Sequence, residues 1–171
     1  MDATSLGLPP AWAGIDLGPG SVAAGRILHL TGFVPQACAY TLAELQQLPS
    51  RMLGTTEIVC LTGEQVARAD SYRGVALIDL LAQTGLGNVS RHALKECMII
   101  ARGSDGYRAL FSWNELYNTP VGDGVIVVYE RDGDALDPHL GPCALISASD
   151  LRTGPRHLRQ LCEIKVLRIS G

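Results

Sequence analysis

Short strand-like segments that follow one another without long helices between them dominate the second half of this chain. They are rich in apolar residues, and turn residues bound them. They cover residues 97–101, 107–111, 125–129, 143–147 and 163–169. Asp105-Gly106 and Asp132-Gly133 beside them tolerate positive φ, as turns require. Because strands and long helices do not alternate regularly, we expect an α+β fold with mixed, largely antiparallel sheets and short helices.

The short helices are indicated by their ends. Thr41 with Glu44 has the pattern of a capping box, and Ser112 with Glu115 repeats it directly after a strand segment. A third helix is predicted by three apolar residues at helical spacing, namely Leu77, Leu80 and Leu81. Gly85 follows them at the position of a left-handed cap.

The chain has 171 residues, a length that fits one folded domain. Residues 1–25 are rich in Gly, Pro and Ala without periodicity, so we expect an irregular arm followed by a domain at 26–171. The net charge of −3 argues against nucleic acid or an anionic membrane as a partner. No apolar run approaches the ~20 residues of a membrane helix. Without a visible signal peptide we expect a cytoplasmic protein, or a periplasmic one if a leader was removed.

Cys60 is the cysteine most open to a chemical role. The five cysteines are widely spaced and odd in number, which favours free thiols in a reducing compartment over a disulfide framework. Cys60 ends a short apolar run, and Leu61-Thr62-Gly63 breaks the pattern at once. A thiolate there could bind a metal in a pocket beside the strand end. A cysteine in an apolar run is also commonly a small packing residue, so both interpretations are open.

Basic residues gather where an anion could bind. Arg73 precedes a glycine, and segment 102–108 combines arginines with a glycine-rich turn. Segment 150–159 concentrates four basic side chains in an otherwise acidic protein, namely Arg152, Arg156, His157 and Arg159. Guanidinium groups pair with phosphate oxygens in two-point contacts. Each segment is equally compatible with a solvated surface turn.

Five motifs follow one another in a recognisable order. They are Cys60-Leu61-Thr62-Gly63, Tyr72-Arg73-Gly74-Val75, Gly103-Ser104-Asp105-Gly106-Tyr107-Arg108, Gly141-Pro142 and Thr153-Gly154-Pro155-Arg156-His157-Leu158-Arg159. In this order and spacing the chain resembles the molybdopterin-binding domain of the sulfite oxidase family, and particularly its short single-domain relatives. The resemblance covers residues 26 to 169.

The resemblance implies a cofactor and a set of residues that bind it. Cys60 matches the cysteine that supplies a thiolate to molybdenum, beside the dithiolene of molybdopterin. The implied pterin and phosphate contacts are Asp105, Gly106, Tyr107, Arg156 and Arg159. Thr62 and Arg73 join these candidates because they lie in the same motifs, and Arg152 joins them because it lies in the basic segment 150–159. The implied reaction is oxygen-atom transfer at a molybdenum centre, with electrons passing to a separate acceptor protein.

A second function fits the same fold. After Gly141-Pro142 the family continues with Pro-Leu-Arg, where this chain has Cys143-Ala144-Leu145. Residues 1–25 also lack a match to the family's upstream Arg-Asn-His segment. The alternative is therefore a non-catalytic pocket that binds a pterin-like or other anionic small molecule.

Overall fold

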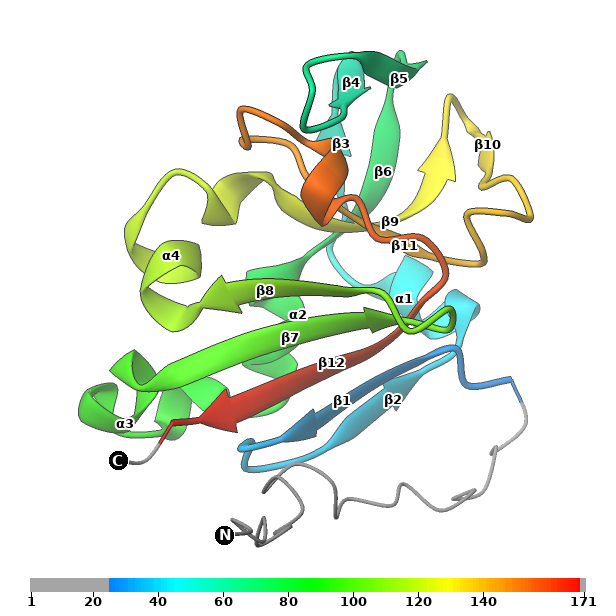
Figure 1. Cartoon of the computed structure of the whole chain (residues 1–171). Coiled ribbons are helices and arrows are strands. Elements are labelled where there is room, and N and C mark those ends of the chain that lie inside the picture. Colours follow the sequence, from blue (N-terminus) through cyan, green and yellow to red (C-terminus); the bar gives the residue numbers. More distant parts are fainter. Residues whose placement is uncertain (1–24, 170–171) are drawn as a thin grey trace, which may run out of the picture.

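The computed structural model describes residues 25–169, whose sheets are mixed and largely antiparallel as predicted. Figure 1 shows a lower sheet, an upper sheet, and a small hairpin at the top of the molecule. The arm predicted for residues 1–25 lies outside the described range except for Gly25. No helix in residues 25–169 is both long and apolar enough to cross a membrane.

The first sheet has five strands. In spatial order they are β2 (Cys38–Tyr40), β1 (Leu28–Gly32), β12 (Leu161–Arg168), β7 (Cys97–Gly103) and β8 (Arg108–Ser112). β1 and β12 run parallel, and the other neighbours are antiparallel. The sheet therefore brings the first described strand beside the last one (Figure 1).

The second sheet is antiparallel and places the most apolar strand at its centre. Its strands are β10 (Asp134–Ala135), β9 (Val125–Arg131), β6 (Tyr72–Ala76) and β3 (Arg51–Leu53), with β11 (Ala144–Ser147) also paired to β9. β4 (Thr56–Val59) and β5 (Gln65–Ala69) form a separate two-stranded hairpin. This hairpin carries Cys60 at the end of β4.

Three of the four α-helices lie where the sequence predicts them, and the one at Arg91–Lys95 was not predicted. The helices are α1 (Leu42–Gln47), α2 (Leu77–Gln83), α3 (Arg91–Lys95) and α4 (Trp113–Asn118), with 3-10 turns η1 (Leu86–Asn88), η2 (Gly122–Gly124) and η3 (Gly154–Arg156). Both predicted capping boxes are present, at Thr41 with Glu44 and at Ser112 with Glu115. Gly85 has a φ of 75°, which confirms the predicted left-handed conformation after α2.

Two hydrophobic cores lie on opposite faces of the second sheet. On β9, Val125 and Val127 belong to the larger core, which the first sheet and the helices complete. Ile126 and Val128 belong to a smaller core that also contains Ile58 from the hairpin. Both faces of β9 are therefore buried, which explains its unbroken apolar run. The smaller core forms the floor beneath the candidate site.

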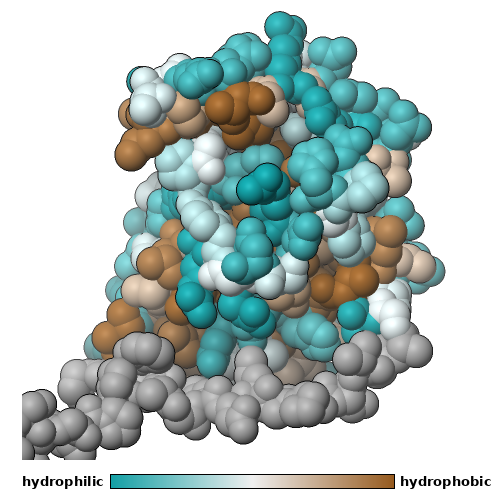
Figure 2. All heavy atoms as spheres, turned by 45° about the vertical axis from the view of Figure 1, so that its right-hand side comes forward, coloured by the Kyte–Doolittle hydropathy of each residue, from teal (hydrophilic) through white to brown (hydrophobic). Residues whose placement is uncertain are grey.

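The outer surface is largely polar on the face shown in Figure 2, and its apolar side chains form separate patches. The most exposed leucines of the described chain are Leu61 and Leu151. Leu61 directly follows Cys60, and Leu151 directly precedes Arg152, whose side chain approaches Gly63 in the turn after Cys60.

Candidate functional site

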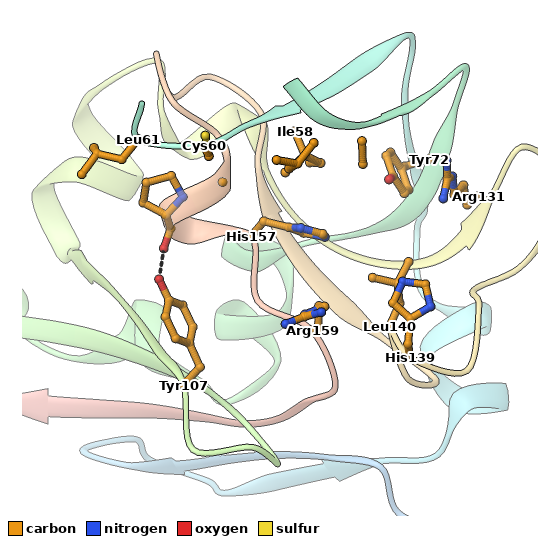
Figure 3. A pocket seen from close by; sticks show the side chains of 14 residues that line it. Ile58, Cys60, Leu61, Tyr72, Tyr107, Arg131, His139, Leu140, His157 and Arg159 are labelled. Carbon is orange, nitrogen blue, oxygen red and sulfur yellow. Dashed lines mark hydrogen bonds between the residues drawn. The ribbon is translucent and has the colours of Figure 1, made fainter. Parts of the chain in front are cut away.

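A cavity of about 680 Å³ lies beside the β4–β5 hairpin, within the size range of small-molecule sites. Its lining combines apolar residues, two tyrosines and several basic side chains: Ile58, Cys60, Leu61, Val66, Ala67, Tyr72, Tyr107, Arg131, His139, Leu140, Gly154, Pro155, His157 and Arg159. Figure 3 shows Cys60 at one end of this cavity and Tyr72 and Arg131 at the other. Residues far apart in the sequence therefore meet in one pocket.

Cys60 stands at the start of a tight turn. Its carbonyl accepts a hydrogen bond of 2.9 Å from the backbone N–H of Gly63, and Gly63 has a φ of 94° that favours glycine. Sγ of Cys60 lies 2.8 Å from Oγ1 of Thr62. The Thr62 hydroxyl beside the thiol lowers the pKa of Cys60. The turn thus favours the thiolate, the form of cysteine that binds metals.

The β11–β12 loop holds the strand that carries Cys60. The backbone N–H of Val59 donates to Oγ1 of Thr153 at 2.8 Å, and this hydroxyl donates to the carbonyl of Glu57, also at 2.8 Å. The next residue, Gly154, packs so closely that an added Cβ would lie 3.1 Å from Cα of Cys60. The end of β4 is therefore fixed by side-chain and backbone contacts from more than ninety residues away.

Thr153→Val should destabilise the protein by about 1–3 kcal/mol, because it leaves the N–H of Val59 and the carbonyl of Glu57 without their partner. Thr153→Ser keeps the hydroxyl and should cost less than about 1 kcal/mol. Urea unfolding of both variants measures the difference. Equal stability of Thr153→Val and the wild type would show that the two hydrogen bonds of the Thr153 hydroxyl do not stabilise the fold.

Tyr107 closes another side of the cavity. Its hydroxyl donates a hydrogen bond of 2.6 Å to the carbonyl of Pro155, drawn as a dashed line in Figure 3. Oδ1 of Asp105 accepts from the backbone N–H of Tyr107 at 3.0 Å, and Gly106 between them has a φ of 86°. The β7–β8 turn is thus tied to the β11–β12 loop, which brings its predicted residues to the site.

The polar part of the lining is basic. Arg159 lines the cavity, and within residues 25–169 no carboxylate forms an ion pair with it. Arg131 is tied to Asp132 and Asp137 at 3.5 and 3.6 Å. Burial, with Arg159, His139 and Arg131 nearby, lowers the pKa of His157 to about 4. The imidazole of His157 is therefore neutral near pH 7, and Arg159 is the cation best placed to meet an anion.

Most of the residues predicted from the sequence gather here. Cys60, Tyr107 and Arg159 line the main cavity, and Asp105 lines a smaller adjoining one of about 230 Å³. Thr62 contacts the thiol of Cys60. Gly106 lies in the turn between Asp105 and Tyr107. Arg152 lies outside the lining but packs over the Cys60 turn, with Nη2 3.4 Å from where a Cβ of Gly63 would stand.

Arg73 and Arg156 have other partners in the structure. The segment around Arg73 forms strand β6, and the Arg73 side chain lies 3.6 Å from Glu130. Arg156 forms ion pairs with Asp150 and Glu115. Neither side chain lines the cavity. Both arginines neutralise carboxylates of the chain itself, and their contact with a bound anion stays a prediction from the sequence.

Several lining residues were missed by the sequence interpretation. Arg131, His139 and Leu140 come from β9 and the segment after β10, and none of the three was predicted as a site residue. Ile58 lies in the apolar run before Cys60 and Tyr72 lies in the motif with Arg73, but neither was predicted as a site residue. His157 stood inside a noted basic segment but was not singled out. Only the pairing of β6 with β9 and the packing of the hairpin bring these residues together.

Comparisons with known proteins agree with the fold. The family model described as the oxidoreductase molybdopterin binding domain matches residues 24–168. Among solved structures, the sulfane dehydrogenase SoxCD from Paracoccus pantotrophus is similar, with a TM-score of 0.66 and 18% identity. The match covers 82% of this chain and 37% of that chain, so this chain spans a little over a third of it. No curated protein matches in sequence.

Proposed function

We propose, because this chain belongs to the oxidoreductase molybdopterin binding domain family, that the cavity beside Cys60 binds molybdopterin with its molybdenum. The function inferred is that of an oxidoreductase domain in which Cys60 supplies a thiolate to the metal. The observation that carries it is a half-buried thiol with a lowered pKa in the wall of a basic cavity of about 680 Å³. The proposal includes a separate acceptor protein, as expected from the sequence, that takes electrons from the molybdenum centre.

The residues present fit such a group. A soft thiolate suits a molybdenum centre, and Thr62 favours that form of Cys60. Ile58, Tyr72 and Leu140 offer an apolar floor for a flat heterocycle. Arg159 supplies a cation for a phosphate. Metal, ring and phosphate each have a matching part of the cavity wall.

The bound cofactor would supply oxygen-atom transfer at molybdenum. The chain's own residues bind it and control its surroundings. The apolar floor excludes water, and Arg159 balances the negative charge of the phosphate. The hydrogen bond between Tyr107 and Pro155 holds two loops of the wall together. Asp105, Gly106 and Arg152 support these loops at or beside the cavity wall.

Cys60→Ser should lose most of the bound molybdenum. Loss of outer contacts around a metal typically costs 10–100-fold in affinity, so removal of a direct ligand should cost more than about tenfold. The protein is purified from a host that makes the cofactor, and its molybdenum is measured by elemental analysis and its pterin by fluorescence after oxidation. Cys38→Ser is the matched control, because Cys38 is also half-buried but lies outside the cavity lining.

The outcomes separate the two functions. Molybdenum and pterin near one equivalent in the wild type and in Cys38→Ser, with metal lost in Cys60→Ser, support the oxidoreductase. Pterin without molybdenum in the wild type supports the non-catalytic binding pocket, for which the engagement of Arg73 and Arg156 in internal ion pairs is the favouring observation. A wild-type protein free of both pterin and metal would refute the proposal.

A further inference from the structure

One side chain in the cavity wall has a ring nitrogen that the protein does not satisfy. Nε2 of His157 is buried and has no hydrogen-bond partner among the described residues. Within residues 25–169 only Oγ of Ser147 shares this property, and Ser147 is not part of the cavity lining. Leaving a buried polar atom unpaired costs about 1–3 kcal/mol. Such an atom calls for a partner that the protein itself does not provide.

The imidazole of His157 is held at the cavity by its backbone. The backbone N–H of His157 donates to the carbonyl of Gly154 at 3.0 Å, which ends η3. The next residue, Leu158, exchanges two backbone hydrogen bonds with Leu145, at 2.8 and 2.9 Å. Figure 3 shows the ring of His157 projecting across the cavity below Ile58 and above Leu140. The unpaired nitrogen is therefore positioned among the apolar residues of the floor.

The charge state of this ring limits what it can recognise. With a pKa near 4, the ring is neutral near pH 7 and carries one donor and one acceptor nitrogen. In the same cavity Arg159 is the group that attracts an anion, because Arg131 is paired with Asp132 and Asp137. A neutral imidazole among apolar side chains suits an uncharged polar group instead, such as a ring nitrogen or an amino or keto substituent.

We propose that His157 is a ligand-contacting residue, whose Nε2 forms a hydrogen bond with the polar edge of a flat heterocycle seated against Ile58 and Leu140. This inference rests on the proposed cofactor site, because the pterin is such a heterocycle. In this arrangement the ring system of the ligand lies beside His157, and the negatively charged group of the ligand contacts Arg159. The unpaired nitrogen then has a function that explains its cost in the free protein.

The test compares stability and ligand retention in His157→Leu. Without cofactor, this variant should unfold at a urea concentration equal to or above that of the wild type, because an unpaired buried polar atom is removed. Loaded in a cofactor-producing host, it should retain pterin about tenfold less well through gel filtration, because one hydrogen bond is lost. His157→Gln can still donate and accept, and it should retain more pterin than His157→Leu. His92→Gln, on an exposed helix, is the matched control.

Each result decides the inference. Lower retention in His157→Leu, partial recovery in His157→Gln and no change in His92→Gln support it. Equal retention in wild type and His157→Leu overturns the role of His157 while the cofactor site stands. If His157→Leu does not fold, pterin retention is compared among the wild type, His157→Gln and His157→Asn. The Asn side chain is shorter and cannot extend a polar group as far, so His157→Asn should retain less pterin than His157→Gln. A wild type without pterin overturns both this inference and the proposed function.

Discussion

Arg156→Leu should destabilise the protein by about 3 kcal/mol, the cost of breaking a largely buried ion pair by removing one partner. The guanidinium makes a two-point contact with the carboxylate of Asp150 and a second ion pair of 2.8 Å with Glu115. It also lies over the ring of Phe111, 4.4 Å from the centroid. Asp150 is only 12% exposed, so the substitution leaves its charge poorly solvated.

Arg73→Leu is the matched control, because Arg73 makes an exposed ion pair with Glu130 and should cost less than about 1 kcal/mol. The double variant Arg156→Leu/Asp150→Leu should recover part of the lost stability, since no unpaired carboxylate remains at position 150. Urea unfolding measures all three variants. An unchanged midpoint in Arg156→Leu, together with a loss of bound pterin, would instead restore the ligand-binding role expected from the sequence.

Gly74→Ala should destabilise the protein by more than about 3 kcal/mol. An added Cβ would lie 2.1 Å from the carbonyl oxygen of Val127 and 2.6 Å from Cα of Val128. Both atoms belong to the backbone of β9, which pairs with β6 at this point through a register shift. No side-chain rotation can relieve the contact, so the central pair of the second sheet must separate.

Gly54→Ala provides the comparison for this variant, because an added Cβ at Gly54 meets no atom within 4 Å. It should change the midpoint of urea unfolding little, whereas Gly74→Ala should lower it strongly or prevent folding. The pterin content of Gly74→Ala should fall in parallel, since Tyr72 on the same strand lines the cavity. Equal midpoints for the two alanine variants would contradict the close packing of β6 on β9.

The features predicted correctly from the sequence depend on neighbouring residues. The capping boxes at Thr41 and Ser112 and the left-handed Gly85 involve contacts within one helical turn, so the local pattern contains all the information needed. The same holds for Cys60, whose place after an apolar run put it at the end of β4. The mixed, antiparallel sheets followed from closely spaced strands joined by turns.

The features that were missed depend on distant partners. Strand β6 was not predicted, because Arg73-Gly74 was considered only as a possible anion site, whereas Gly74 is required by the approach of β9 more than fifty residues later. Arg156 looked like an anion-binding residue because Glu115, one of its two partners, lies forty-one residues upstream. His157 could not be recognised, since an unpaired buried nitrogen is a property of the folded cavity alone.

X-ray absorption at the molybdenum edge tests the central claim most directly. If Cys60 binds the metal, the spectrum of the wild type should show one sulfur neighbour beyond the pair that the dithiolene supplies, and metal retained by Cys60→Ser should lack it. Cys38→Ser should give the wild-type spectrum. A wild type whose molybdenum shows only the dithiolene sulfurs, or a spectrum unchanged by Cys60→Ser, would contradict the assignment of Cys60 as the metal ligand.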